Sequence, residues 1–237
     1  MRSSRGALTG ARITTWLRGG EGARVGDPGA RPQQSLVLYE FEACPFCRRV
    51  REAFTRLDLE ATIRPCPKGG LRYRAEVEAL GGKQQFPFLV DPNSDRRMYE
   101  SSEIVAYLDR EYGRAGSVTS PESRAFATLT LIASGLGRGN AGSRARTSRI
   151  PDRPLILDGY EAEPESRLVR EVLCELELTY QSRPAAPGSA RRSGDEAQVR
   201  RGARPKLIDP NCRTELSGWQ SIIDHLERTY ALAPKQR

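Results

Sequence analysis

The chain has 237 residues, of which 38% are hydrophobic, and a formal net charge of +8 at pH 7. This apolar content is enough for two modest cores, and no stretch is long or apolar enough to span a bilayer, which excludes a transmembrane protein. The positive charge comes largely from arginines in Gly-, Ser- and Pro-rich runs without interleaved aromatic residues. We interpret these runs mostly as solvated loops and expect no nucleic-acid partner. The five cysteines are an odd number and do not describe a disulfide framework, so a reducing compartment is favoured.

The segment from Met1 to Gly20 is rich in arginine and contains no acidic residue. This composition suits an organelle transit peptide. The segment is not a secretory signal, because it has no apolar region of the kind such signals contain. The sequence Leu17-Arg18-Gly19-Gly20 aligns with Leu136-Gly137-Arg138-Gly139 later in the chain. Because an address signal would not be duplicated inside a chain, we expect the segment to belong to a repeated module. The predicted location is cytoplasmic, with an organelle stroma as the alternative.

The chain next alternates between apolar runs and turn residues, as small α/β domains do. The run from Leu36 to Phe41 predicts a strand, and the i, i+3, i+4, i+7 spacing of apolar residues from Val50 to Leu57 predicts a helix packed on a sheet. In chain order we expect a strand over 36–41, a helix over 48–57, a strand over 61–64, a polar helix over 73–80, a strand over 86–90, a hairpin strand at 97–99 and a helix from Ser101 or Ser102. This βαβ unit followed by a ββα unit is a thioredoxin-like arrangement.

The motif Cys44-Pro45-Phe46-Cys47 lies where the first strand turns into the first helix. A helix start presents unpaired N–H groups and partial positive charge, which stabilise a thiolate. Cys44 is therefore a candidate nucleophile that we expect to be exposed, and Cys47, one turn away, is the natural resolving thiol. Two alternatives stay open: a pair of structural cysteines, or half of a zinc site. Zinc is disfavoured because no second close Cys or His pair exists; the remaining candidates are the scattered Cys66, Cys174, Cys212 and His225.

An internal repeat runs through the chain. Shifted by 119 positions, the sequence aligns Glu42 with Glu161 and Val50-Arg51-Glu52 with Val169-Arg170-Glu171. Shifted by 118 after one deletion, it aligns Asp91-Pro92-Asn93 with Asp209-Pro210-Asn211. So many ordered matches predict two copies of one domain of about 80 residues. The predicted divisions are a basic Gly-rich segment over 1–34, a first domain over 35–113, a basic linker over 114–153 and a second domain over 154–232.

Three motifs in this order carry a family resemblance: Cys44-Pro45-Phe46-Cys47, Phe86-Pro87 opening a strand, and Glu100-Ser101 opening the last helix. Together they resemble the glutaredoxin and glutathione-transferase N-terminal domains of the thioredoxin-like superfamily. The stretches 39–43 and 81–87 resemble a group of tandem-domain proteins of this type. The resemblance covers 36–112 strongly and 154–231 more weakly. It implies an α/β fold of two tandem thioredoxin-like domains.

The resemblance also implies how glutathione, the expected co-substrate, would bind. Pro87 would be cis and opposite the nucleophile, which frees the backbone of Phe86 to pair with an extended glutathione main chain. Glu100 would meet the γ-glutamyl ammonium, and the Ser101 hydroxyl and adjacent N–H groups would meet its carboxylate. A strand-edge proline and a simple N-cap serine are the structural alternatives. The implied catalytic residues are Cys44 and Cys47, and the implied glutathione-binding residues are Phe46, Phe86, Pro87, Glu100 and Ser101.

The second copy departs from this pattern at its chemical positions. Glu163 and Ser166 stand where the first copy has its two motif cysteines, and Gly218 and Trp219 replace Glu100 and Ser101, while Pro205 is retained. A carboxylate cannot perform thiol exchange, so we expect the second domain to be non-catalytic. Cys174 is expected to be a core residue on an amphipathic helix.

The sequence thus predicts a glutathione-linked thiol–disulfide oxidoreductase that acts on disulfide or glutathionylated substrates and needs no metal. Iron–sulfur ligation is disfavoured by the dithiol, proline-containing motif. The alternative is a non-catalytic scaffold that holds glutathione or a partner in the same groove. A full glutathione transferase is disfavoured, because a second thioredoxin-like copy occupies the length of its all-helical domain. The nearby Glu40 and Glu42 are expected to raise the pKa of the motif thiol.

Overall fold

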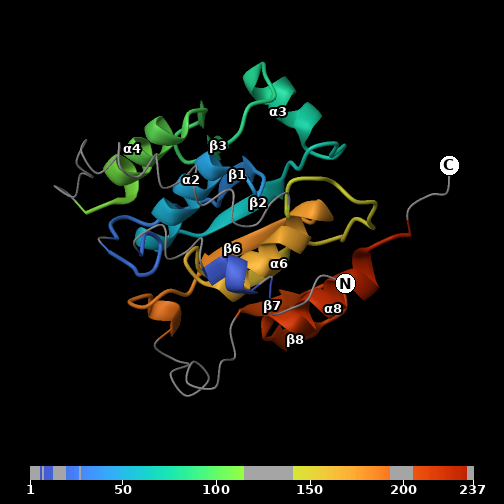
Figure 1. Ribbon diagram of the computed structural model, residues 1–237. Coiled ribbons are helices and arrows are strands. Elements are labelled where there is room, and N and C mark those ends of the chain that lie inside the picture. The colour runs from blue at the N-terminus through green and yellow to red at the C-terminus, as the bar shows by residue number, and fades with distance from the viewer. Residues whose placement is uncertain are drawn as a thin grey trace.

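The computed structural model describes residues 6, 8–12, 20–26, 28–114, 141–192 and 205–233. The first half of the chain contains β1 (Leu36–Glu40), α2 (Pro45–Arg56), β2 (Ala61–Pro65), α3 (Arg74–Gly81), β3 (Phe88–Asp91), β4 (Arg96–Met98) and α4 (Ser101–Tyr112). Figure 1 shows these elements from blue to green. Their order is the predicted one, and α2 begins at its proline, three residues earlier than the apolar spacing indicated.

The second half contains β5 (Leu155–Gly159), α6 (Pro164–Glu175), β6 (Tyr180–Pro184), the short 3-10 helix η1 (Ala190–Arg192), β7 (Lys206–Asp209), β8 (Thr214–Ser217) and α8 (Trp219–Tyr230). Its strands pair as those of the first half do: β5 is parallel to β6 and antiparallel to β7, which pairs with β8. In the first half, β1 is likewise parallel to β2 and antiparallel to β3, which pairs with β4. Residues 1–5, 7, 13–19 and 27 of the N-terminal segment, residues 115–140 of the linker and residues 193–204 lie outside the described residues.

Both halves share one eight-stranded sheet with the order β4-β3-β1-β2-β6-β5-β7-β8. The halves join where β2 and β6 pair antiparallel, with Thr62 opposite Gln181. These two residues are equivalent, meaning that they align in the internal repeat. An approximate two-fold axis therefore passes through this pair, and it places equivalent helices on the same face of the sheet.

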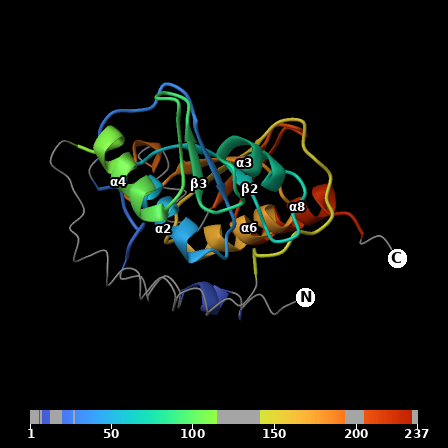
Figure 2. The ribbon, with the colours of Figure 1, turned by 90° about the horizontal axis from the view of Figure 1, so that it is seen from above.

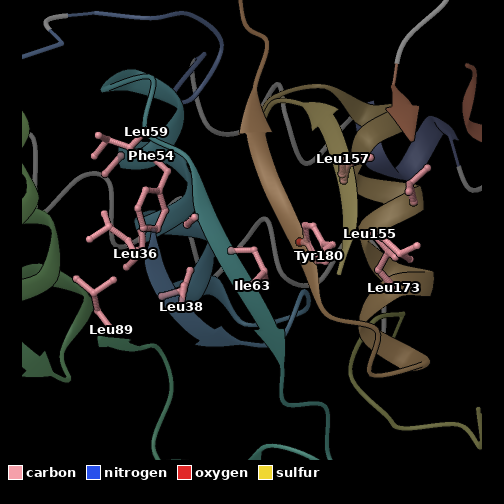
Figure 3. Close-up of a cluster of buried hydrophobic side chains, with 14 of the residues drawn as sticks. Leu36, Leu38, Phe54, Leu59, Ile63, Leu89, Leu155, Leu157, Leu173 and Tyr180 are labelled. Carbon is pink, nitrogen blue, oxygen red and sulfur yellow. The ribbon is translucent and has the colours of Figure 1, made fainter. Parts of the chain in front are cut away.

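The helices and the core follow this symmetry. Figure 2 shows α2 and α6 side by side, with α4 beside α2 and α8 beside α6. One cluster of buried apolar side chains runs through both halves, from Leu36 and Leu38 of β1 to Leu155 of β5 and Tyr180 of β6 (Figure 3). The predicted α/β fold with thioredoxin-like order is confirmed.

The described parts of the two basic segments cross onto the opposite half. The Val25 N–H donates to the Pro187 carbonyl at 2.9 Å, and the Lys68 N–H donates to the Ser143 carbonyl at 2.7 Å. Arg146 forms ion pairs with Glu175 at 3.0 Å and with Glu227 at 2.7 Å. The arginines of this part of the linker, Arg144, Arg146, Arg149 and Arg153, lie in loops and are exposed, as predicted, although its backbone bonds to folded structure.

Candidate functional site

The cysteine motif lies at the carboxyl end of β1, where the chain turns into α2. Cys44 is the N-cap of α2 with extended backbone (φ −74°, ψ 120°), and Pro45 occupies the first helical turn, where no N–H donor is needed. The Cys47 N–H donates a hydrogen bond to Cys44 Sγ at 3.3 Å, and the Arg48 N–H donates to the Cys44 carbonyl at 3.1 Å. The motif thus places a sulfur at a helix amino terminus.

The two thiols have pKa values shifted in opposite directions. Hydrogen bonds from the Cys47 side chain and backbone lower the pKa of Cys44, and they outweigh burial and the Glu40 carboxylate, which raise it. Burial, followed by the hydrogen bond to Cys44 and its charge, raises the pKa of Cys47 well above the usual range. This difference favours a thiolate on Cys44 and a thiol on Cys47, as a nucleophile with a resolving partner requires.

The Cys44 side chain is less accessible than the sequence suggested. Only 4% of Cys44 is exposed and Cys47 is fully buried, whereas Phe46 between them is 47% exposed. The expectation of an exposed Cys44 is therefore wrong. The N-cap geometry turns its sulfur back over the first helical turn, toward the Cys47 N–H. The contact that stabilises the thiolate also withdraws it from solvent.

The Phe86–Pro87 peptide bond is cis, as the resemblance implies. It immediately precedes β3, which runs antiparallel to β1 with Phe88 opposite Tyr39. Continuing this register places Phe86 beside the turn that carries the motif. The Phe86 and Phe41 rings meet edge to face there, with centroids 6.2 Å apart. The strand register therefore brings this predicted segment next to the cysteines.

Glu100 and Ser101 open α4. Glu100 is the N-cap residue with φ +63°, a left-handed value that costs a non-glycine residue free energy. The Gln85 side chain donates a hydrogen bond to the Glu100 carboxylate, which joins Glu100 to the Phe86–Pro87 segment. Ser101 is buried in the first turn, so the N-cap alternative for this serine is wrong. Among the described contacts, none links Ser101 to either motif cysteine.

The turn of the second half that is equivalent to the cysteine motif has a similar backbone but different side chains. Glu163 is the N-cap of α6, and the buried Ser166 hydroxyl donates to its carboxylate. Gly218, the N-cap of α8, has φ +86° at the position equivalent to Glu100. Glycine adopts this conformation without a Cβ penalty, so the second half avoids the strain that Glu100 keeps.

A cluster of buried charges lies behind the motif, where the two halves meet. Glu40, at the end of β1, forms an ion pair with Arg51 of α2, and both are buried. Burial raises the pKa of Glu40 to about 7 despite Arg51, which lowers it. The predicted effect of Glu40 on Cys44 is present, since this carboxylate raises the pKa of the thiol. Glu42 pairs with Arg51 at 3.3 Å and also with Arg170 of the other half at 3.1 Å.

This charge cluster repeats across the approximate two-fold axis. Arg51 Nε lies 2.9 Å from Glu161, and the equivalent Arg170 Nε lies 3.1 Å from the equivalent Glu42. Burial raises the pKa of Glu161, but Arg170 and Arg51 outweigh it and lower the value to about 2. The sequence alignment of these residues between the copies was the signal for the cluster, although alignment alone did not reveal their burial.

Cys174 belongs to the same interface. It is buried, as predicted, and its sulfur accepts a hydrogen bond from the Glu42 N–H at 3.4 Å. The equivalent Thr55 hydroxyl accepts one from the Glu161 N–H at 3.2 Å. Burial raises the pKa of Cys174 well above the usual range, so it is not a competing nucleophile.

A cavity of about 630 Å³ lies away from the cysteines. Ser35, which precedes β1, lines it together with Asp58, Gln181 and Arg191, whereas the motif follows the other end of β1. Arg31, also in its lining, forms an ion pair with Asp58 at 2.8 Å. The cavity is thus separate from the candidate site.

Comparison with known proteins assigns the first half to a domain type. Residues 38–117 match the family model for the glutathione S-transferase N-terminal domain. No curated protein matches the chain. One solved structure with a similar chain is described as Leishmania TDR1, a unique trimeric glutathione transferase; it has 13% sequence identity and a TM-score of 0.30, and the match covers 86% of this chain and 70% of that chain.

Residues 38–117 therefore form a thioredoxin-like domain of the glutathione S-transferase N-terminal type. The matched domain type is that of glutathione S-transferases. Among the described residues, no helix is both long enough and apolar enough to cross a membrane.

Proposed function

We propose that the protein is a glutathione-linked thiol–disulfide oxidoreductase with Cys44 as nucleophile and Cys47 as resolving thiol. The observation that carries this proposal is the geometry at the start of α2, where Cys44 is the N-cap residue and its sulfur accepts a hydrogen bond from the Cys47 N–H at 3.3 Å. A side-chain hydrogen bond between the two cysteines lowers the pKa of Cys44, and burial together with this bond raises the pKa of Cys47. Two structural cysteines would not need this difference.

The reaction is a pair of thiol–disulfide exchanges. The Cys44 thiolate attacks the glutathione sulfur of a glutathionylated substrate; a Cys44–glutathione disulfide forms, and the substrate leaves as a thiolate that takes a proton from solvent. A second glutathione thiolate then attacks the glutathione sulfur, releasing oxidised glutathione and the Cys44 thiolate. In the dithiol route, Cys47 loses its proton and attacks Cys44, which releases glutathione and leaves an intramolecular disulfide that two further glutathione molecules reduce.

The residues around the motif turn support glutathione as the co-substrate. Phe46 presents an exposed ring, and the cis Phe86–Pro87 segment lies beside the motif turn. Glu100 keeps a strained backbone that the second half replaces with glycine. Such strain is typical of positions retained for a function, here binding of the γ-glutamyl ammonium.

A non-catalytic glutathione-binding scaffold is the second candidate. The 4% exposure of Cys44 favours it, because a disulfide substrate must reach that sulfur. The two candidates differ in turnover, since a scaffold would retain glutathione without reducing a mixed disulfide.

A glutathione-dependent reduction assay on a glutathionylated peptide tests the proposal. Cys44→Ser should abolish turnover, Cys47→Ser should retain it by the glutathione route, and Cys66→Ala is the matched control for a buried thiol outside the site. Equal activity in Cys44→Ser and the parent protein would contradict the assignment. Glutathione binding without turnover in the parent protein would establish the scaffold instead.

We further propose that the second half is a duplicate that lost the site and kept the fold. In a chain with both motif cysteines changed to serine, the four changes Glu163→Cys, Ser166→Cys, Gly218→Glu and Trp219→Ser should recover measurable reduction. A control with only the two restored cysteines should stay weak, because Trp219 still stands where the serine would receive a carboxylate. Robust turnover before any restoration would show that the second half already carries the chemistry.

A further inference from the structure

Three metal-ligating side chains of different chemistry converge in the second half. Asp209 ends β7, Cys212 lies in the β7–β8 turn, and His225 lies on α8. His225 Nε2 is 2.9 Å from Asp209 Oδ2 and 3.8 Å from Cys212 Sγ. One ligand atom of each residue lies within 4.8 Å of the others. The sequence predicts no metal, because it contains no close Cys or His pair besides the motif cysteines; Asp209, Cys212 and His225 are 3 and 13 positions apart.

The first half shows what this place in the fold contains when it is purely structural. There Ser94 and Tyr107 stand at the positions equivalent to Cys212 and His225. The Ser94 and Tyr107 hydroxyls are 2.7 Å apart, and Tyr107 donates to Asp91 at 2.6 Å. A hydroxyl accepts one hydrogen bond while donating another, so these groups form a satisfied chain.

The second half cannot form the same chain. In the first half Asp91 also accepts a hydrogen bond from Tyr112. The second half retains both residues, since Tyr230 donates to Asp209 at 2.8 Å. However, one imidazole nitrogen, His225 Nε2, faces both Asp209 and Cys212. A single ring nitrogen either donates or accepts, so Nε2 cannot relay a hydrogen bond from the Cys212 thiol to Asp209 as the Tyr107 hydroxyl does from Ser94 to Asp91. A cation placed between them satisfies all three at once.

The spacing of the donor atoms fits a small tetrahedral ion. Zinc bonds of about 2.3 Å to sulfur and about 2.0 Å to nitrogen place these ligand atoms about 3.5 Å apart at a tetrahedral angle. The measured Cys212–His225 distance is 3.8 Å. The Asp209–His225 distance of 2.9 Å has to widen by about 0.5 Å to reach the corresponding oxygen–nitrogen separation. Rotation of the His225 ring or the Asp209 carboxylate supplies a movement of this size.

The surroundings orient two of the ligands. The Asn211 N–H and side-chain amide hold Asp209 Oδ1 at 2.9 and 3.0 Å, which leaves Oδ2 directed toward His225. The Thr229 hydroxyl lies 3.5 Å from His225 Nδ1, one helical turn further along α8. When a metal displaces the proton that Nε2 shares with Asp209, the Thr229 hydroxyl can accept the hydrogen bond from the Nδ1–H. Cys212 is exposed, which leaves a solvent side for a fourth ligand.

We propose that Asp209, Cys212 and His225 form a zinc-binding site in the second half of the chain. A sulfur, a nitrogen and an oxygen donor favour a borderline-soft ion such as Zn²⁺ over Mg²⁺ or Ca²⁺, which prefer oxygen ligands. On binding, the Cys212 thiol releases its proton to solvent, and the thiolate and carboxylate balance the two positive charges. The duplicated domain that lost the thiol-exchange motif thus gained a metal site at its other end.

Cobalt titration of the full chain tests this site by absorption. Cys44→Ser and Cys47→Ser are introduced first, so that the motif dithiol cannot bind the metal. We expect one equivalent of Co²⁺ to produce thiolate-to-cobalt charge-transfer absorption, and Zn²⁺ to displace it. Cys212→Ser with His225→Tyr installs the hydroxyl cluster of the first half, and it should weaken binding by at least about 100-fold and abolish the absorption.

Cys212→Ser alone, at an exposed position, serves if the double variant does not fold; it should abolish the charge-transfer absorption. Absence of saturable cobalt–thiolate absorption in the chain that carries only Cys44→Ser and Cys47→Ser would overturn the proposal. Unchanged absorption in Cys212→Ser would do the same, because another thiol would then be the ligand.

Discussion

Replacing Glu40 with glutamine should change how the stability of the fold depends on pH. Burial raises the pKa of Glu40 from 4.5 to about 7, so the folded protein holds this proton more tightly than the unfolded chain. Protonation of Glu40 therefore stabilises the fold below about pH 4.5, and this stabilisation is lost as the pH rises through about 7. The difference between the two pKa values corresponds to about 3 kcal/mol of unfolding free energy. Glutamine does not titrate and shows no such loss.

Urea unfolding of the parent protein and Glu40→Gln between pH 4.5 and 8 measures this effect. The other titrating groups are shared, so the difference in unfolding free energy between the two proteins isolates position 40. This difference should move in favour of Glu40→Gln by about 3 kcal/mol across the range. The variant should also alkylate faster at Cys44, because the carboxylate that raises its pKa is gone. A difference that stays constant with pH would refute the reasoning.

Three further changes test separate parts of the structure. Arg51→Met leaves the buried Glu40 carboxylate without its ion-pair partner and should lower the unfolding free energy by about 3–5 kcal/mol in thermal or urea unfolding. The exposed control Arg97→Met should change it by less than about 0.5 kcal/mol, and equal effects would contradict the buried cluster. Glu100→Gly should raise stability by about 1 kcal/mol while weakening retention on immobilised glutathione, and a loss of both would contradict the strain argument. Brief alkylation with peptide mapping should label Cys44 before Cys66, whose pKa burial raises; the reverse order would exclude Cys44 as the reactive thiol.

The elements of the first half were predictable from the sequence because their signals are local. The apolar spacing from Val50 to Leu57 specifies the helix face, Gly81-Gly82 ends α3, and the turn 91–95 separates β3 from β4. The cysteine motif was also a local signal, since a strand, a turn and a proline fix the helix start. These predictions needed no knowledge of contacts between distant residues.

The features that were missed depend on how distant segments pack. The burial of Cys44 follows from the direction in which an N-cap side chain turns, which the sequence does not specify. The pairing of β2 with β6 brings Glu42 to Arg170 across 128 positions, and the alignment of these charges did not reveal that they are buried. Asp209 and His225 likewise meet only when α8 packs beside β7.

Trapping the first covalent intermediate tests the central claim most directly. Cys47→Ser protein is incubated with oxidised glutathione, and intact-mass measurement with peptide mapping locates the adduct. The Cys44 thiolate has no intramolecular resolving thiol in this variant, so one glutathione should accumulate on Cys44 and be released by reduced glutathione. An adduct on Cys66, Cys174 or Cys212 instead, or no adduct under conditions where Cys44 is alkylated, would contradict the assignment of Cys44 as the nucleophile.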